Sequence, residues 1–386
     1  FSKKHLRPLN YTCDDDIIEA VPKSNTHSGF TYVLTGLKKK GENMDGIFNK
    51  FRSKLDDVYS NGSFNSPILI GFRTQASGEY EDDGSRTDTC KHKLRVVSMI
   101  DLMTIIAELM FAKPFQDSIA KEDFYAGGKD EREISKILYY WRTRYKKFMS
   151  IDYSSYDQTI SSWLIEDAFK IIKSAFVPFS EEEERIWDAM VHDFIHKDFI
   201  INEGIVHSDK GVPSGSMWTQ IVDSIVNVLV VKTYFHSIGA VCNMMAMGDD
   251  NIIFTRNGIN LEELSSYLAK NFGLIVKVDD KSNEGPTTKD PKFLSRYWTN
   301  HGEWRHPNQL ISRMAFPERR RDYTGEISPA HVLTAFILTY SAGMQQLIDV
   351  PKFMSEHKIS RKDLLKKVDS RYLPGALAYI RDYTSG

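Results

Sequence analysis

The strongest constraint on the fold is the position of acidic residues at the ends of short apolar segments. Residues 148–151 form a largely apolar run, suited to a buried strand, that ends at Asp152. Residues 242–247 and 251–254 are two further apolar segments, and the Gly-Asp-Asp of residues 248–250 joins them into a predicted β-hairpin. We therefore expect one aspartate at a strand end to lie beside an acidic hairpin tip.

These carboxylates predict a metal site. Carboxylates gathered at buried strand ends repel one another, which costs several kcal/mol unless a cation neutralises them. Asp152, Asp249 and Asp250 would offer oxygen ligands suited to Mg²⁺ or Mn²⁺, and two such ions can support an in-line phosphoryl displacement. Gly-Asp-Asp alone is more often an ordinary turn. The additional Asp152 makes the metal site the preferred interpretation.

The segments around these residues predict an α/β (α+β) fold, with a small antiparallel sheet backed by helices. The predicted elements are helices at 163–176, 181–196, 216–237 and 260–273, a hairpin at 199–206 and a strand at 274–278. A capping box of Ser180 and Glu183 opens the second helix. Residues 1–95 show no clear architecture, and the pattern is mostly helical from about residue 328.

A polar stripe runs along the long apolar helix predicted at 216–237. Thr219, Asp223 and Asn227 are spaced by four, so they share one face. Such a stripe is either satisfied internally or recognises a ligand in a cleft, and internal satisfaction is the simpler explanation for the stripe alone. Ser214 and Gly215 precede this helix, where backbone N–H groups can approach a phosphate or sugar closely.

Bulk composition adds only broad limits. The 386 residues suffice for two or three subdomains, and the three cysteines suggest neither a disulfide framework nor a zinc pattern. The net charge of −2 is unusual for a nucleic-acid enzyme, although positive charge can line one channel of an acidic protein. No apolar run predicts a membrane span. The chain begins at Phe1 rather than Met, so we expect a trimmed start.

Three motifs in order resemble the palm of viral RNA-dependent RNA polymerases. They are Asp152-x4-Asp157, Ser214-Gly215-x3-Thr219 and Gly248-Asp249-Asp250. Residues 273–282 resemble the strand-and-lysine motif of that family, residues 293–296 its primer grip, and residues 91–97 its basic fingers motif. The resemblance covers about residues 90–300. The amino-acid sequence of the middle motif is most similar to that in polymerases of partitiviruses and picobirnaviruses, which are double-stranded RNA viruses.

The resemblance implies a right-hand polymerase, with fingers at 1–145 and 160–215, palm at 146–160 and 216–300, and thumb at 301–386. It also implies a role for each matching residue. Asp152 and Asp249 would hold two Mg²⁺ or Mn²⁺ ions, assisted by the Ile151 carbonyl and Asp250. Lys281 would protonate pyrophosphate. The ribose would be positioned by Asp157, Ser214, Gly215 and Thr219. The triphosphate would be held by Lys93 and Arg95, and RNA would be contacted by Lys91 and Arg296.

One position departs from the family pattern. The family usually has Asn four residues after the motif threonine, where this chain has Asp223. Two carboxylates, Asp157 and Asp223, cannot share a hydrogen bond unless one is protonated or a hydroxyl lies between them. The ribose 2′-hydroxyl would therefore be sensed by Asp223 or by Asn227, and the sequence leaves both open.

The predicted function is RNA-directed RNA synthesis from nucleoside triphosphates. The predicted partners are template and product RNA, nucleoside triphosphates and a viral capsid protein, without a membrane. We expect the chain to act in the host cytoplasm, inside the virion or a replication particle. The alternative is an inactive palm-fold RNA-binding protein associated with a capsid, and a metal-dependent phosphatase or nuclease would share the carboxylates. Reverse transcriptases usually have an aromatic residue two positions before Asp-Asp, where this chain has Met247.

Overall fold

The computed structural model describes residues 5–11, 21, 27–33, 39–44, 46–80, 86–258, 260–278, 284–300, 302–304, 350–358 and 360. The chain forms two compact units. The first comprises residues 1–73, 96–129 and 140–294, and the second comprises residues 74–95, 130–139 and 295–386. Of the helical region predicted from residue 328, only α12 (Val350–Glu356) lies within the described residues. Within that described part, no helix combines the length and apolar character needed to span a membrane.

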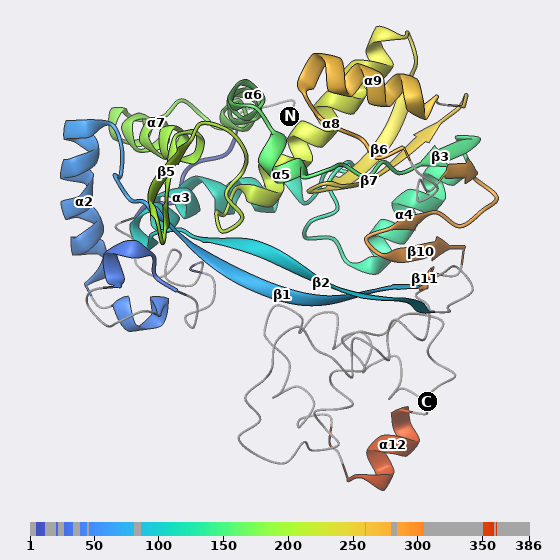
Figure 1. Cartoon of the computed structure of the whole chain (residues 1–386), viewed down its shortest axis with the longest axis horizontal. Helices are drawn as coiled ribbons and strands as arrows, with labels where there is room; N and C mark the ends of the chain where they lie inside the picture. The colour runs from blue at the N-terminus through green and yellow to red at the C-terminus, as the bar shows by residue number, and fades with distance from the viewer. Residues whose placement is uncertain are drawn as a thin grey trace. The chain divides into compact units, whose positions relative to one another are not determined.

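One four-stranded sheet carries the acidic hairpin. Its strands lie in the order β6 (Cys242–Met247), β7 (Asp250–Thr255), β3 (Lys147–Met149) and β8 (Glu284–Pro286), and all neighbours are antiparallel. Helices α8 (Thr219–Ser237) and α9 (Leu261–Phe272) lie together on one side of β6 and β7 (Figure 1). The predicted antiparallel sheet backed by helices is confirmed.

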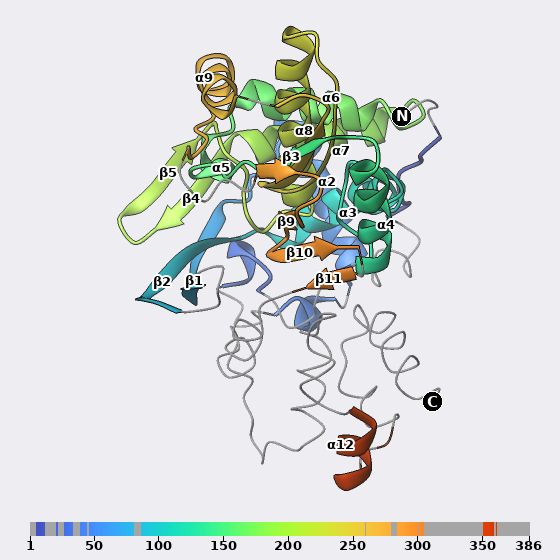
Figure 2. The same ribbon diagram turned by 90° about the vertical axis from the view of Figure 1, so that its right-hand side faces the viewer.

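A second four-stranded sheet follows the order β2-β1-β4-β5. Its strands are β1 (Ile68–Tyr80), β2 (Arg86–Met99), β4 (Lys197–Ile201) and β5 (Gly204–Ser208). Strand β1 pairs with β4 in parallel, and β4 and β5 form the predicted hairpin, which extends at the edge of the sheet in Figure 2. The long strands β1 and β2, the helix α2 (Ile47–Asn61) and the short helices η1 (Phe30–Tyr32) and η2 (Lys40–Asn43) were not predicted from the sequence.

Aromatic side chains form the centre of the helical layer in the first unit. Helices α3 (Leu102–Ile119), α6 (Ser162–Lys173) and α7 (Glu181–Ile195) join α8 in one buried cluster. The ring centroid of Trp187 lies 5.1 Å from that of Phe111 and 6.0 Å from that of Trp218. In both pairs the two ring planes are nearly perpendicular. Edge-to-face pairs of this kind contribute about 0.5–1.5 kcal/mol each beyond their burial. Trp218, the residue just before α8, is thus buried in this cluster.

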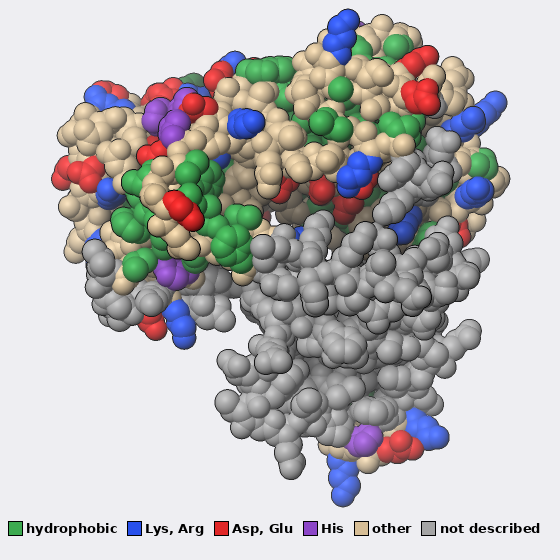
Figure 3. Space-filling view, viewed as in Figure 1, with side chains coloured by type: hydrophobic (Ala, Val, Ile, Leu, Met, Phe, Trp, Pro, Cys, Tyr) green, Lys and Arg blue, Asp and Glu red, His purple; other side chains and the backbone are tan. Residues whose placement is uncertain are grey.

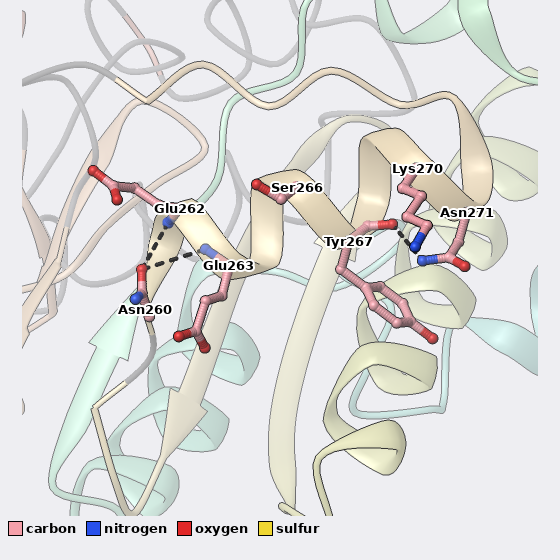
Figure 4. A pocket seen from close by; sticks show the side chains of 7 residues that line it. All are labelled: Asn260, Glu262, Glu263, Ser266, Tyr267, Lys270 and Asn271. Atoms are coloured by element: carbon pink, nitrogen blue, oxygen red, sulfur yellow. Dashed lines mark hydrogen bonds between the residues drawn. The ribbon is translucent and has the colours of Figure 1, made fainter.

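Local signals set most helix boundaries. The predicted capping box at Ser180 is present, with its hydroxyl accepting from Glu183 N and the Glu183 carboxylate accepting from Ser180 N. Asn260 Oδ1 accepts from the first amides of α9, as Figure 4 shows. Helix α8 begins at Thr219 rather than at the predicted residue 216.

The strand predicted at 274–278 is wrong. This segment forms a single antiparallel bridge, Tyr153 with Val276, flanked by backbone bonds from Ser154 N to Ile275 O and from Lys277 N to Asp152 O, each 2.8 Å. Beyond Ser154 the partner segment turns into the short helix α5 (Tyr156–Thr159), which ends the pairing in that direction.

The remaining described elements are one helix and three short strands. Helix α4 (Glu131–Arg142) precedes β3, and β9 (Lys292–Phe293) precedes the antiparallel pair β10 (Arg296–Thr299) and β11 (Gly302–Trp304).

Candidate active site

Asp152 follows the central strand β3. Met149 pairs with Ile253 of β7, and the chain then leaves the sheet through Ser150 and the buried Ile151. The Asp152 side chain is 57% exposed. Asp152 is thus held just beyond the end of the central strand, while its carboxylate faces solvent.

Asp249 and Asp250 form the tip of the β6–β7 hairpin, as predicted. Met247 pairs with Asp250, so Gly248 and Asp249 are the two turn residues, and Gly248 adopts the positive φ of 68° that such a turn favours. Both aspartates are exposed. The expectation of buried carboxylates was therefore wrong, and a cation is favoured here by the oxygen donors rather than by desolvation.

The backbone beneath the aspartates is held by Asn251. Its side chain is 2% exposed and joins the two parts of the site. Asn251 Oδ1 accepts from Ile151 N at 3.0 Å, and Asn251 Nδ2 donates to Ile151 O at 3.0 Å and to Asp249 O at 3.1 Å. One neutral side chain therefore fixes the residue before Asp152 against the hairpin turn.

Two side chains of α8 secure the same turn from the other side. Asn227 Nδ2 donates to Gly248 O at 3.0 Å and to Asp249 O at 3.1 Å, and Ser224 Oγ accepts from Gly248 N at 2.8 Å. Asn227 Oδ1 accepts from the buried Tyr153 hydroxyl at 3.1 Å. Both N–H groups of the Asn227 amide, and one acceptor position of its oxygen, are thus used by the protein itself.

The predicted stripe on α8 is largely satisfied internally. The Thr219 hydroxyl lies 2.6 Å from Pro213 O and 3.0 Å from Ser216 O, which ties the first residue of the helix to the preceding loop. With Asn227 bound to the hairpin, Asp223 is the stripe residue that differs. Its Oδ1 is buried and has no hydrogen-bond partner among the described residues.

Electrostatics favour a protonated Asp223. Burial, followed by the negative charges of Asp157 and Asp249, raises the pKa of the Asp223 carboxyl well above its usual range. A protonated carboxyl can donate as well as accept a hydrogen bond. This resolves the difficulty of placing Asp223 near Asp157, because a neutral acid and a carboxylate can share a ligand hydroxyl.

The loop before α8 is pressed against strand β2. Ser214 Oγ accepts from Ser98 N at 3.0 Å and donates to Val96 O at 3.2 Å. A Cβ added at Gly215 would lie 1.9 Å from Ser98 O, a distance that real side chains do not reach. Glycine at this position is therefore explained by close approach of two backbones, beside any role in binding a ligand.

Glu108 anchors the same loop from α3. Its fully buried carboxylate accepts from Ser216 Oγ at 2.7 Å and from Met217 N at 2.8 Å. Burial raises the pKa of Glu108 to about 7, although these two hydrogen bonds and the charge of Lys40 act in the opposite direction. The anchor is therefore a carboxyl that titrates near neutral pH.

A lysine not predicted from the sequence meets the site. Lys277 Nζ lies 2.8 Å from Asp152 Oδ2, and its own backbone N–H binds Asp152 O. The predicted general acid, Lys281, lies outside the described residues. Lys277 belongs to the same predicted motif.

The basic residues of the second unit are described only in part. Arg95 is exposed, and the side chains of Lys91 and Lys93 lie outside the described set. Arg296 donates to Glu131 Oε1 at 2.6 Å and lies 4.0 Å from Glu303. The predicted RNA contact of Arg296 would have to compete with this ion pair.

A separate hollow lies along α9. Figure 4 shows its lining, which comes from one helix and its N-cap and includes Glu262, Glu263, Tyr267 and Lys270. None of the predicted site residues contributes to it. The carboxylates of Asp152, Asp249 and Asp250 are instead exposed.

The side chains missed by sequence reasoning left weak signals. Asn251 is the polar residue at the start of an apolar strand, Glu108 is a charge within an apolar helix, and Ser224 adjoins the stripe. Each signal indicates burial with a partner. None identifies the partner, which comes from a distant part of the chain.

Comparisons with known proteins agree with this geometry. The family described as viral RNA-dependent RNA polymerase matches residues 3–317. The RNA-directed RNA polymerase of Cryptosporidium parvum virus 1 is 30% identical over 163 residues, which cover 40% of this chain and 30% of that protein. The corresponding protein of Atkinsonella hypoxylon virus is 30% identical over 135 residues, covering 31% of this chain and 20% of its own length. The chain thus spans less than a third of these curated relatives.

The fold matches a solved polymerase. The crystal structure of the RNA-dependent RNA polymerase of a human picobirnavirus superposes with a TM-score of 0.68 at 15% identity, covering 100% of this chain and 72% of that one. The predicted right-hand fold and the resemblance to double-stranded RNA virus polymerases are confirmed. The chain belongs to the viral RNA-dependent RNA polymerase family.

Proposed function

We propose that this chain copies an RNA template into RNA by transferring nucleotides from nucleoside triphosphates to an RNA 3′-hydroxyl. The observation that supports this best is the bonding of Asn251 to both Ile151 and Asp249. It joins the strand end bearing Asp152 to the hairpin bearing Asp249 and Asp250. Acidic side chains from two separate segments are thus held along one edge, which suits metal-assisted phosphoryl transfer.

The donor set fits Mg²⁺ or Mn²⁺. All three side chains are carboxylates and are exposed, and the ammonium of Lys277 against Asp152 indicates that this carboxylate accepts a cation. Asp152 and Asp249 would hold two ions, with the Ile151 carbonyl and Asp250 assisting. When bound, the ions supply charge neutralisation at the triphosphate and activation of the attacking hydroxyl.

We infer that Asp223, rather than Asn227, senses the ribose. Asn227 uses both amide N–H groups on the hairpin turn and accepts from Tyr153, whereas Asp223 keeps an oxygen without a partner among the described residues. A protonated Asp223 would donate to the 2′-hydroxyl while Asp157 accepts from it. Ser214, Gly215 and Thr219 would shape this subsite through the loop they hold.

The other roles remain proposals. Lys281 would protonate pyrophosphate, Lys93 and Arg95 would hold the triphosphate, and Lys91 and Arg296 would contact RNA. The fingers, palm and thumb would follow the predicted boundaries. A capsid protein is the proposed partner, and the proposed setting is a viral particle in the host cytoplasm. No observation favours the inactive alternative.

The decisive experiment measures incorporation of a labelled ribonucleotide on a homopolymeric RNA template with Mg²⁺ or Mn²⁺. We expect template-dependent product from the native chain. The Asp249→Ala, Asp250→Ala double variant should lose activity on the order of a thousand-fold or more, because transition-state charge is then unsupported. Equal thermal stability of the two proteins would exclude unfolding as the cause. Equal product from both would refute the metal assignment.

A further inference from the structure

A cluster of histidine and aspartate side chains lies outside the proposed active site, where α7 and β5 end. His196 caps the C-terminus of α7, His207 belongs to β5, and Asp209 follows that strand. In Figure 3 histidine side chains gather over α7 and β5 beside acidic side chains. His196 Nδ1 lies 2.6 Å and His207 Nε2 lies 2.7 Å from the same oxygen, Asp209 Oδ1.

The two imidazoles are arranged around this carboxylate in parallel. Their ring planes differ by 7°, and their centroids are 6.5 Å apart. The three potential ligand atoms lie within 4.8 Å of one another. Among the described residues, no other set of three His, Cys, Asp or Glu side chains is this close. A tetrahedral zinc site places its ligand atoms roughly 3.3 Å apart, so the exposed side chains would need only small movements to enclose an ion.

A fourth side chain orients one of the imidazoles. Asp198 faces His207 across the β4–β5 ladder, and its Oδ1 lies 2.8 Å from His207 Nδ1. Histidine ligands of metals almost always donate their second ring N–H to a carboxylate or carbonyl, which directs the other nitrogen at the ion. His207 Nδ1–H donates to Asp198 Oδ1, and loss of the Nε2 proton, which is shared with Asp209, would direct the Nε2 lone pair at an ion bound beside that carboxylate.

We propose that His196 Nδ1, His207 Nε2 and the Asp209 carboxylate bind one divalent transition-metal ion such as Zn²⁺, with solvent in the fourth position. Imidazole nitrogens select such ions over Mg²⁺, which prefers oxygen ligands. The site is therefore chemically distinct from the carboxylate edge proposed for polymerisation, and it does not depend on that proposal.

The competing explanation is a set of ordinary exposed hydrogen bonds. Hydrogen bonds to Asp198 and Asp209 raise the pKa of His207, and those to His196 and His207 lower the pKa of Asp209. His192 also approaches, with its ring 4.8 Å from that of His196 while it bonds to Asp193. A metal must displace the proton of His207, so its affinity should rise with pH.

The position of the site suggests what an ion would do. Asp209 lies just before Gly211 and Val212, whose N–H groups bind Ile160 O at 2.8 Å and Asp157 O at 2.7 Å. The ion would tie the end of α7 and the strand β5 to the segment that enters the Ser214 loop. It would hold that segment in place without touching the reacting atoms.

The test uses the full chain, freed of metal with a chelator and titrated with Zn²⁺ in excess Mg²⁺ by calorimetry. We expect one Zn²⁺ per chain, with affinity rising from pH 6 to 7.5, and visible Co²⁺ absorption typical of tetrahedral coordination. His207→Ala should abolish binding, and Asp198→Asn should weaken it about 10–100-fold.

His236→Ala, which removes an exposed histidine on α8, is the matched control and should bind Zn²⁺ like the native chain. If His207→Ala does not fold, Asp198→Asn still decides. The proposal is overturned if the native chain binds no Zn²⁺ in excess Mg²⁺, or if His207→Ala or Asp198→Asn binds it as tightly as the control.

Discussion

The β6–β7 and β4–β5 hairpins both carry acidic side chains, but different kinds of interaction hold them in place. At the tip of β6–β7 the aspartates are exposed, but buried neutral groups of Ser224, Asn227 and Asn251 hold the backbone that carries them. Along β4–β5 the exposed Asp198 and His207 hold each other. Exposed ion pairs contribute about 0–1 kcal/mol and respond to salt and pH, whereas buried neutral hydrogen bonds do not. A rigid carboxylate edge and an adjustable charged surface thus occur in one unit.

The largest expected effect tests whether neutral side chains fix the carboxylate edge. Asn251→Leu removes three hydrogen bonds and leaves the N–H and C=O of the buried Ile151 without these partners, whereas Asp249 O keeps its bond from Asn227. Each such group costs about 1–3 kcal/mol, so we expect unfolding stability to fall by about 3 kcal/mol. The Mg²⁺ concentration needed for half-maximal activity should rise. Chemical denaturation and Mg²⁺ titration measure the two effects.

A matched control is Asn243→Leu on β6. Asn243 is a half-buried asparagine in the same hairpin and makes no side-chain hydrogen bond among those seen in the described residues. Its loss should leave the Mg²⁺ requirement unchanged. If both variants raise that requirement equally, the contrast between the two hairpins fails.

The second prediction concerns Glu108, a buried anchor that carries charge. Its folded pKa of about 7 exceeds the usual 4.5, so the stability it contributes is full below pH 4.5 and is lost as pH rises to about 7. The change is on the order of 3 kcal/mol. Glu108→Gln should flatten the stability profile in this window. Denaturation at pH 5 and 8 measures it, and parallel profiles for both proteins would contradict the buried titration.

The smallest expected effect concerns Asp223. An amide has nearly the shape of a protonated carboxyl, so Asp223→Asn should change the rate of ribonucleotide incorporation by about threefold or less, under 1 kcal/mol of activation free energy. Because the pKa of Asp223 is raised above its usual 3.8, the free energy of unfolding of the native chain should fall as pH rises above 3.8. The free energy of unfolding of the variant should fall less over the same range. A large loss of selection for ribose in the variant would show that Asp223 acts as a carboxylate.

Local patterns predicted much of this structure. The hairpin at Gly248, the capping box at Ser180 and the N-cap at Asn260 were all found, because each depends on neighbours in sequence. The apolar segments and helix signals around the acidic residues predicted the α/β fold class, and the resemblance of the motifs implied the right-hand architecture.

Contacts between distant segments were not predictable. The pairing of β1 with β4 joins Ile68 to Phe199, and Glu108 reaches a loop more than a hundred residues away. The strand predicted at 274–278 failed because its partner, rather than its own composition, ends the ladder. Likewise, the contact of Lys277 with Asp152 depends on how its segment pairs with the chain after β3, while Lys281 lies outside the described residues.

The two-residue turn of the β6–β7 hairpin also limits how this gene can change in length. Met247 opposes Asp250, and every pair back to Cys242 and Thr255 follows from that register. Inserting or deleting one codon would reverse which side chains face the core along the altered strand. Between residues 242 and 255 the coding sequence should therefore accept substitutions far more readily than single-codon insertions or deletions.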